Sequence, residues 1–112
     1  MARTPANFSH NNQLSSAAED LISAVQASEK QIIRKLSFRN TGTTTRTVTV
    51  YIVESGGTAD TGTELDVKGI PGGGVWNVLV AQGEVLTSGM TLQAKQDTGT
   101  DINSNCSGST VT

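Results

Sequence analysis

Cysteine and histidine are almost absent from this chain of 112 residues, which contains one of each, Cys106 and His10. A single cysteine excludes a disulfide within the chain and any metal cluster held by several thiolates. We therefore expect Cys106 to be a small buried thiol, with a contact between subunits as the alternative. His10 lies in a polar segment with no Cys or carboxylate cluster beside it, so the sequence predicts neither a metal site nor a catalytic triad around it.

Long apolar runs and an excess of basic charge are also absent. No stretch approaches the length of a membrane span, and the first residues, MARTPANFSHNNQLSS, lack the apolar region of a secretory signal. The chain has 8 Lys and Arg against 10 Asp and Glu, a formal net charge of −2, which disfavours nucleic acid as a partner. We expect a protein without a membrane or nucleic-acid partner that is made and kept in a soluble, cytosol-like setting.

The charges are unevenly placed along the chain. Basic residues gather in residues 30–46, and acidic residues follow from Glu54 onward. The simple interpretation is a pair of solvated faces. The alternative is that the basic face of one copy meets the acidic face of a neighbour.

Three short motifs are weak candidates for chemistry. Asp60-Thr-Gly and Asp97-Thr-Gly match the aspartic-protease triplet, but their polar surroundings favour two turns. Asp60, Glu64 and Asp66 offer oxygen ligands for calcium, although their spacing matches no EF-hand loop. Pro71-Gly-Gly-Gly lacks the lysine of a phosphate-binding loop and leads into a predicted strand. We predict no enzyme activity, no catalytic residue, no cofactor and no metal site.

The first 17 residues differ in composition from the rest of the chain. They are rich in Asn, Ser, Ala and Gln, with Phe8 and Leu14 as isolated apolar residues. Such a segment is too polar to form a core of its own. We predict an extended N-terminal arm at 1–17 that a partner holds, and one domain at 18–112. Residues 16–26 suit a short helix and an extended strand equally.

From Leu21 onward, short apolar stretches alternate with clusters of Gly, Asn, Ser and Thr about every ten residues, which is typical of an antiparallel sandwich or barrel. The stretch KLSFRNTGTTTRTVTVYIVE at 35–54 predicts a β-hairpin with its turn at 40–43. Further strands are expected at 65–67, 75–80, 90–94 and 102–106. Residues 75–80 are apolar on both faces, which predicts a central strand or one covered by a second subunit.

The predicted fold is therefore all-β: a single antiparallel β-sandwich, or a jelly-roll-like barrel, of about seven strands. A core of this size is thin, so contacts between subunits would add to its stability.

Three segments, KQIIRKLSFRNTGTTTRTVTVYIVESGG, GIPGGGVWNVLV and GEVLTSGMTLQAKQDTGTDINSNCSG, resemble small β-sandwich virion proteins of tailed bacteriophages. The resemblance spans about residues 20–112 and depends on turns and strand pattern. The features that carry it are Asn40-Thr41, Thr47 to Tyr51, Pro71-Gly72, Val85-Leu86 with Gly89, Thr91 to Ala94, and Ser107-Gly108.

The resemblance implies a virion protein, and we expect a head decoration or cement protein that bridges neighbouring capsid subunits. It would be a homo-oligomer whose partner is the major capsid protein or another virion protein. A neck, tail or fibre-adaptor component is the first alternative, and a host-glycan-binding module is the second. The expected interface residues are Phe8, Leu14, Arg34, Arg39, Arg46 and Trp76.

Overall fold

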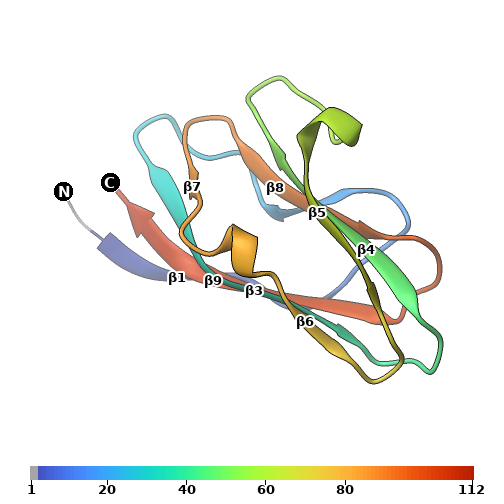
Figure 1. Cartoon of the computed structure of the whole chain (residues 1–112). Helices are drawn as coiled ribbons and strands as arrows, with labels where there is room; N and C mark the ends of the chain where they lie inside the picture. The colour runs from blue at the N-terminus through green and yellow to red at the C-terminus, as the bar shows by residue number, and fades with distance from the viewer. Residues whose placement is uncertain (1–2) are drawn as a thin grey trace.

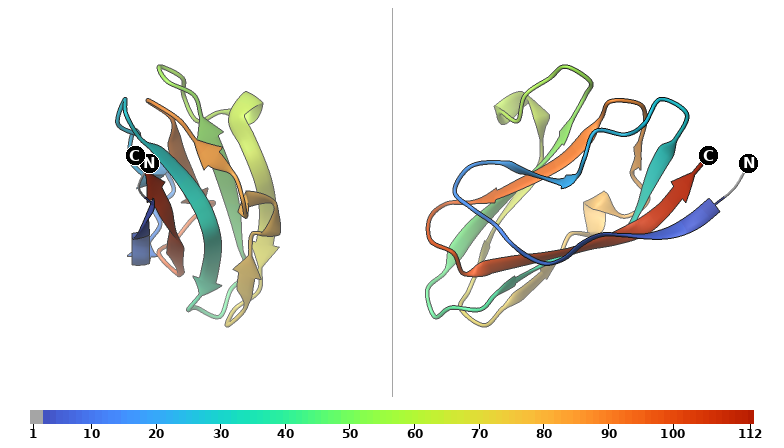
Figure 2. Two further views of the ribbon diagram at one scale, coloured as in Figure 1. Left: turned by 90° about the vertical axis from the view of Figure 1, so that its left-hand side faces the viewer. Right: turned by 180° about the vertical axis from the view of Figure 1, so that it is seen from behind.

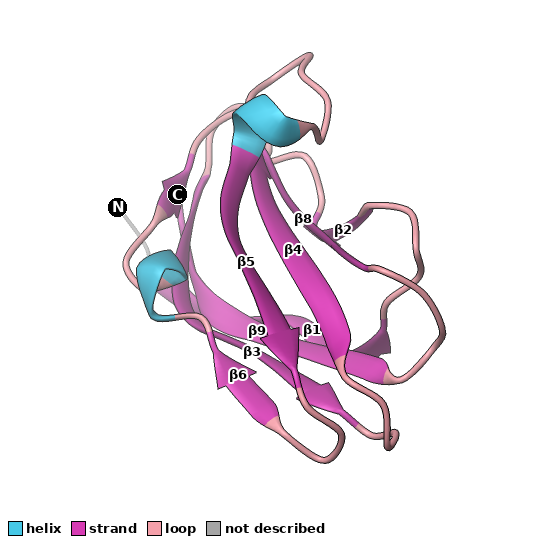
Figure 3. Ribbon diagram, turned by 45° about the vertical axis from the view of Figure 1, so that its right-hand side comes forward, coloured by secondary structure: helices cyan, strands magenta, loops and turns pink. Residues whose placement is uncertain are grey.

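The computed structural model describes residues 3–112 and contains two antiparallel β-sheets packed face to face (Figure 1). The prediction of an all-β sandwich is confirmed, with nine strands in place of about seven. The strands are β1 (Arg3–Gln13), β2 (Glu19–Ile22), β3 (Lys30–Asn40), β4 (Arg46–Val53), β5 (Glu64–Ile70), β6 (Val75–Asn77), β7 (Val85–Leu86), β8 (Thr91–Gln96) and β9 (Ile102–Val111). Two short 3-10 helices, η1 (Thr61–Thr63) and η2 (Leu79–Ala81), precede β5 and follow β6 (Figure 3).

The two sheets differ in their strand order. Sheet A has the order β1-β9-β3-β6, and β7 also pairs with β3, whereas sheet B has the order β2-β8-β4-β5. The left-hand view in Figure 2 shows the two sheets edge-on as two layers. Inward-facing side chains of both sheets fill the core between them because strand residues alternate between faces. Its fully buried members include Ile33, Leu36, Phe38, Val48, Val50, Leu92 and Ile102.

Residues 35–54 do not form the predicted hairpin. β3 lies in sheet A and pairs with β9, β6 and β7, while β4 lies in sheet B between β8 and β5. The loop 41–45 therefore crosses from one sheet to the other. The period-two pattern of the two strands was correctly predicted, but such a pattern does not decide which strands become neighbours.

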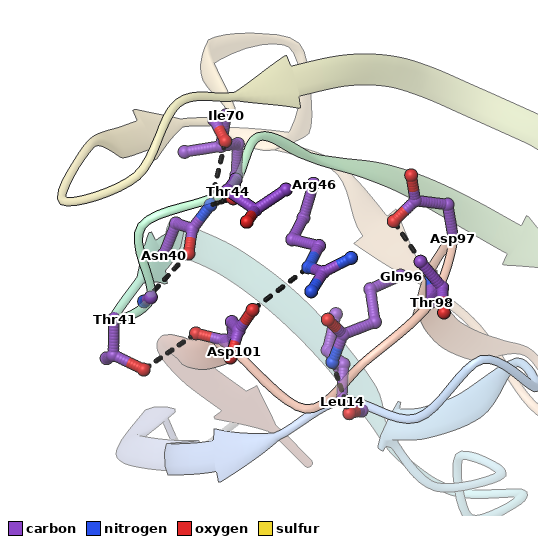
Figure 4. A network of polar contacts seen from close by, with 11 residues as sticks. Leu14, Asn40, Thr41, Thr44, Arg46, Ile70, Gln96, Asp97, Thr98 and Asp101 are labelled. Carbon is purple, nitrogen blue, oxygen red and sulfur yellow. Dashed lines mark hydrogen bonds and ion pairs between the residues drawn. The ribbon is translucent and has the colours of Figure 1, made fainter.

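The crossing is stabilised by the buried side chain of Asn40 (Figure 4). Its Nδ2 donates hydrogen bonds to the carbonyl oxygens of Thr44 (2.7 Å) and Ile70 (2.9 Å), and its Oδ1 accepts one from the Gly42 N–H (3.0 Å). One amide side chain thus satisfies backbone groups of the loop and of β5, which would otherwise be left unpaired at the corner.

Residues 3–13 of the predicted N-terminal arm form β1, which pairs along β9 at the edge of sheet A. Residues 1–2 of that predicted arm lie outside the described residues. The segment is extended, and it pairs with the chain's own sheet along β9. Leu14, which follows it, is fully buried in the core, and Phe8 packs against the core. Polar residues form a strand here because one face of an edge strand is solvated.

The sequence suits a helix and a strand equally at 16–26, and the structure has extended chain there. β2 pairs antiparallel with β8, and Leu21 and Ile22 are both buried. The two described ends of the chain also meet: Arg3 lies opposite Val111, so the start of β1 and the end of β9 are side by side at one end of the sandwich (Figure 1).

Candidate functional site

The two Asp-Thr-Gly triplets lie in separate exposed turns. Asp60 caps η1, where its Oδ1 accepts a hydrogen bond from the Gly62 N–H (2.9 Å). Asp97 accepts one from the Thr98 N–H (2.8 Å) in the turn that follows β8. Each carboxylate is thus engaged with its own local backbone, as turn-forming Asp residues commonly are. The prediction that both triplets form turns is confirmed.

The described residues, 3–112, hold no group of three or more His, Cys, Asp or Glu side chains arranged to bind a metal ion. The calcium alternative for Asp60, Glu64 and Asp66 thus has no gathered ligand set to support it. Nor does this part of the chain include a helix long and apolar enough to cross a membrane.

The structure places the six predicted interface residues in different environments. Leu14 is fully buried, and Trp76 is 6% exposed with its ring centroid 5.8 Å from that of Phe38. The prediction that Leu14 and Trp76 are contact residues is therefore wrong for this fold, because both side chains are needed in the chain's own core. Phe8 is partly buried against the same core.

Two of the three predicted arginines are exposed at the surface. Arg34 and Arg39 are exposed on β3. Arg46 instead forms an ion pair with Asp101, with 2.9 Å between Nε and Oδ2, and joins the start of β4 to the turn before β9 (Figure 4). The exposed acidic residues Glu54, Asp60 and Glu64 lie on sheet B or its connecting loop.

The open edge of sheet A carries exposed apolar side chains that the sequence-based choice of residues missed. Val75 is 57% exposed, Leu79 70%, Val80 52% and Val85 43%. We call these four residues the apolar strip. They belong to the single segment that runs from β6 through η2 to β7 beside β3. In soluble proteins, exposed apolar residues that gather on one surface often mark an interaction site.

The strip exists because the outer neighbour of β3 is interrupted. β6 pairs with β3 over only three residues, and the backbone then turns into η2. Val78 and Ala81 point into the core and are fully buried, so Leu79 and Val80 between them point outward. The Gly83 N–H then donates to the Ile33 carbonyl (2.7 Å), and the chain returns to β3 as β7.

The signal for the strip was present in the sequence. Residues 75–80 were predicted to be a strand that is central or covered by a second subunit, since both faces are apolar. The strand is in fact shorter, lies at an edge, and is uncovered in the chain alone. Of the two alternatives, a central position is wrong, and cover by a second subunit stays a prediction.

The chain matches no protein-family model, no curated protein and no solved structure to which it was compared.

Proposed function

We propose that this chain is a structural protein of a bacteriophage particle, and specifically a head decoration or cement protein that bridges neighbouring capsid subunits. The observation that carries the proposal is the apolar strip, which lies on a free sheet edge and is exposed in the chain alone. The sequence resemblance to small β-sandwich virion proteins supports assignment to this class of assembly.

The proposed mechanism is adhesion through buried apolar area. Covering Leu79, which is 70% exposed, would contribute about 1–2 kcal/mol, and the three valines of the strip would add similar or smaller amounts. A stable interface buries on the order of 1,200–2,000 Å² in total, so the strip would form only its apolar centre. Arg39, exposed and directly opposite Val75 in the sheet, would supply charge at its rim.

Placing an acidic group in the strip tests this proposal. We expect Leu79→Asp to fold like the parent chain, because residue 79 is at the surface, and to lose at least about tenfold in affinity for purified phage heads that lack the protein. Quantitative sedimentation of heads with added protein measures the affinity. Ala27→Asp adds the same charge at an exposed loop position outside the strip and serves as the matched control.

Equal binding by Leu79→Asp and Ala27→Asp would contradict a role for the strip. Copy number distinguishes the head from the neck, tail or fibre adaptor, since a cement protein is present in hundreds of copies per particle and a ring component in about a dozen. Mass-spectrometric counting on purified particles measures it.

A further inference from the structure

The outer face of sheet A contains a polar hollow of about 260 Å³ that the proposed assembly role does not use. Its lining residues come from three adjacent strands. They are Asn7 and His10 of β1, Lys35 and Ser37 of β3, and Asn105 and Ser107 of β9, with Cys106 between the last two. Asn7, Ser107 and Lys35 are register partners and form one row across the sheet.

The hollow owes its shape to irregular pairing. β1 shifts register between Asn7 and Ser9 and again between Ser9 and Asn12, and β3 shifts next to Lys35. Asn11 has φ 49°, the only positive φ of a non-glycine residue in the described chain. Bulges of this kind redirect side chains and are common beside binding sites. Here they interrupt the flat surface of the sheet and bring His10 to the same hollow as Asn105.

The hydrogen-bonding groups of the lining are largely unused. The Asn105 Oδ1 accepts a hydrogen bond from the Asn11 N–H (3.0 Å), which leaves the two N–H groups of the Asn105 amide for a ligand. Lys35 forms no ion pair within residues 3–112, where the one ion pair joins Arg46 and Asp101. No carboxylate lines the hollow. It therefore offers one uncompensated cation surrounded by amide and hydroxyl groups.

This donor set favours one class of ligand. A single ammonium group matches one negative charge, whereas phosphate is usually bound by several arginines or a nest of backbone N–H groups. Asn and Ser side chains both donate and accept hydrogen bonds, as sugar hydroxyl groups do. A peptide carboxylate only accepts hydrogen bonds, so it matches this lining less well. A volume of about 260 Å³ is below the range of about 300–1,000 Å³ for drug-sized ligands, which suits a single sugar ring.

We propose that the hollow formed by Asn7, His10, Lys35, Ser37, Asn105 and Ser107 binds one acidic monosaccharide unit, with the carboxylate of the sugar on Lys35. The inference does not depend on the capsid role, since it concerns a different surface from the apolar strip. No aromatic side chain lines the hollow to stack on the sugar ring, so the affinity for a single unit is weak, about millimolar.

A nuclear magnetic resonance titration of the ¹⁵N-labelled full chain with sodium glucuronate tests the proposal. We expect saturable shifts in the backbone amide signals of the lining residues below about 50 mM. Glucose tests the hydroxyl groups without the charge, and acetate tests the charge without the hydroxyl groups. Each should bind at least about fivefold more weakly than glucuronate.

Lys35→Met removes the charge at an exposed position, and we expect it to weaken glucuronate binding by about tenfold with the rest of the spectrum unchanged. Lys68→Met makes the same change at an exposed position of sheet B and should bind like the parent chain. Absence of saturable shifts, an equal response to acetate, or equal losses in the two variants would each overturn the proposal. Loss of head binding in Leu79→Asp would leave this result unaffected, so the two proposals can fail separately.

Discussion

Asn40 shows how one buried polar residue fixes the course of the backbone. It is fully buried, and its amide bonds to the Thr44 and Ile70 carbonyl oxygens and to the Gly42 N–H. Removing a side chain like this leaves buried groups unpaired, which costs more than the net contribution of the hydrogen bonds themselves.

We predict that Asn40→Ala lowers the free energy of unfolding by about 2–4 kcal/mol, because three backbone groups lose their partner at once. Urea denaturation followed by fluorescence measures the change. Asn77→Ala is the control, since Asn77 is exposed on β6, and it should change stability by less than about 0.5 kcal/mol. Equal stability of the two variants would show that water replaces the Asn40 contacts.

The stability of the fold depends on pH through the buried thiol of Cys106. Burial raises the pKa of the Cys106 thiol from its ordinary value of 9.0 to about 12. The unfolded thiol therefore ionises first. The stability contributed by the protonated thiol is complete below pH 9.0 and is lost as the pH rises toward about 12, by at most about 1.4 kcal/mol per pH unit.

We predict that Cys106→Ala is less stable than the parent chain at neutral pH, and that the difference narrows above pH 9.0, the ordinary pKa of the thiol. Every other titrating group is common to both chains, so the difference isolates the thiol. Urea unfolding at a series of pH values measures it. Parallel stability curves up to about pH 11 would contradict the assigned pKa direction.

At the scale of elements, β1 shows what the sequence could and could not predict. The strands from β3 onward carry alternating apolar residues, which made most of them predictable, whereas β1 carries Asn, Ser and His, and residues 1–17 were predicted to be an extended arm that a partner holds. The pairing of β1 depends on β9, which is formed by residues far away in the sequence. The hairpin predicted at 35–54 was wrong for a similar reason. The local sequence signal for a chain reversal is identical whether the next strand joins the same sheet or the other one.

The apolar strip was partly predictable from the sequence, and the polar hollow was not. The apolar character of residues 75–80 was visible in the sequence, but the outward direction of Leu79 and Val80 follows from η2, which no periodicity indicated. The polar hollow depends on register shifts in β1 and β3, and strand alternation assumes that such shifts are absent.

We predict that removal of residues 1–13 destabilises the domain by about 3 kcal/mol or more, because it uncovers β9 and removes the contact of Phe8 with the core. Leu14→Ala should cost about 2–5 kcal/mol in the full chain, since the side chain is fully buried. His10→Ala, at an exposed position of the same strand, is the control. Thermal and urea unfolding measure all three. A truncated chain as stable as the parent would restore the interpretation of this segment as an arm that a partner holds.

At the scale of the whole molecule, the pairing of distant strands governs folding. β1 and β9 lie at opposite ends of the sequence and side by side in sheet A, and β3 pairs with β9 along almost its whole length. Such contacts close long loops before they contribute stability, so sandwiches of this kind fold slowly.

We predict refolding on a timescale of about milliseconds to seconds, with Trp76 as the probe, because its ring is buried beside Phe38 only in the folded state. Stopped-flow dilution from urea measures the rate. Microsecond refolding would show that local structure dominates. Phe38→Leu keeps an apolar side chain beside Trp76 and tests whether the fluorescence change reports this pair.

The register of Arg3 with Val111 has a practical consequence. A peptide or fluorescent domain fused to either end of the chain leaves the molecule from the same pole. The loops 41–45, 71–74 and 97–101 stand at the opposite pole, where Asn40 pairs with Ile102. A short linker between the two ends would also give a closed chain that can be reopened at an exposed loop.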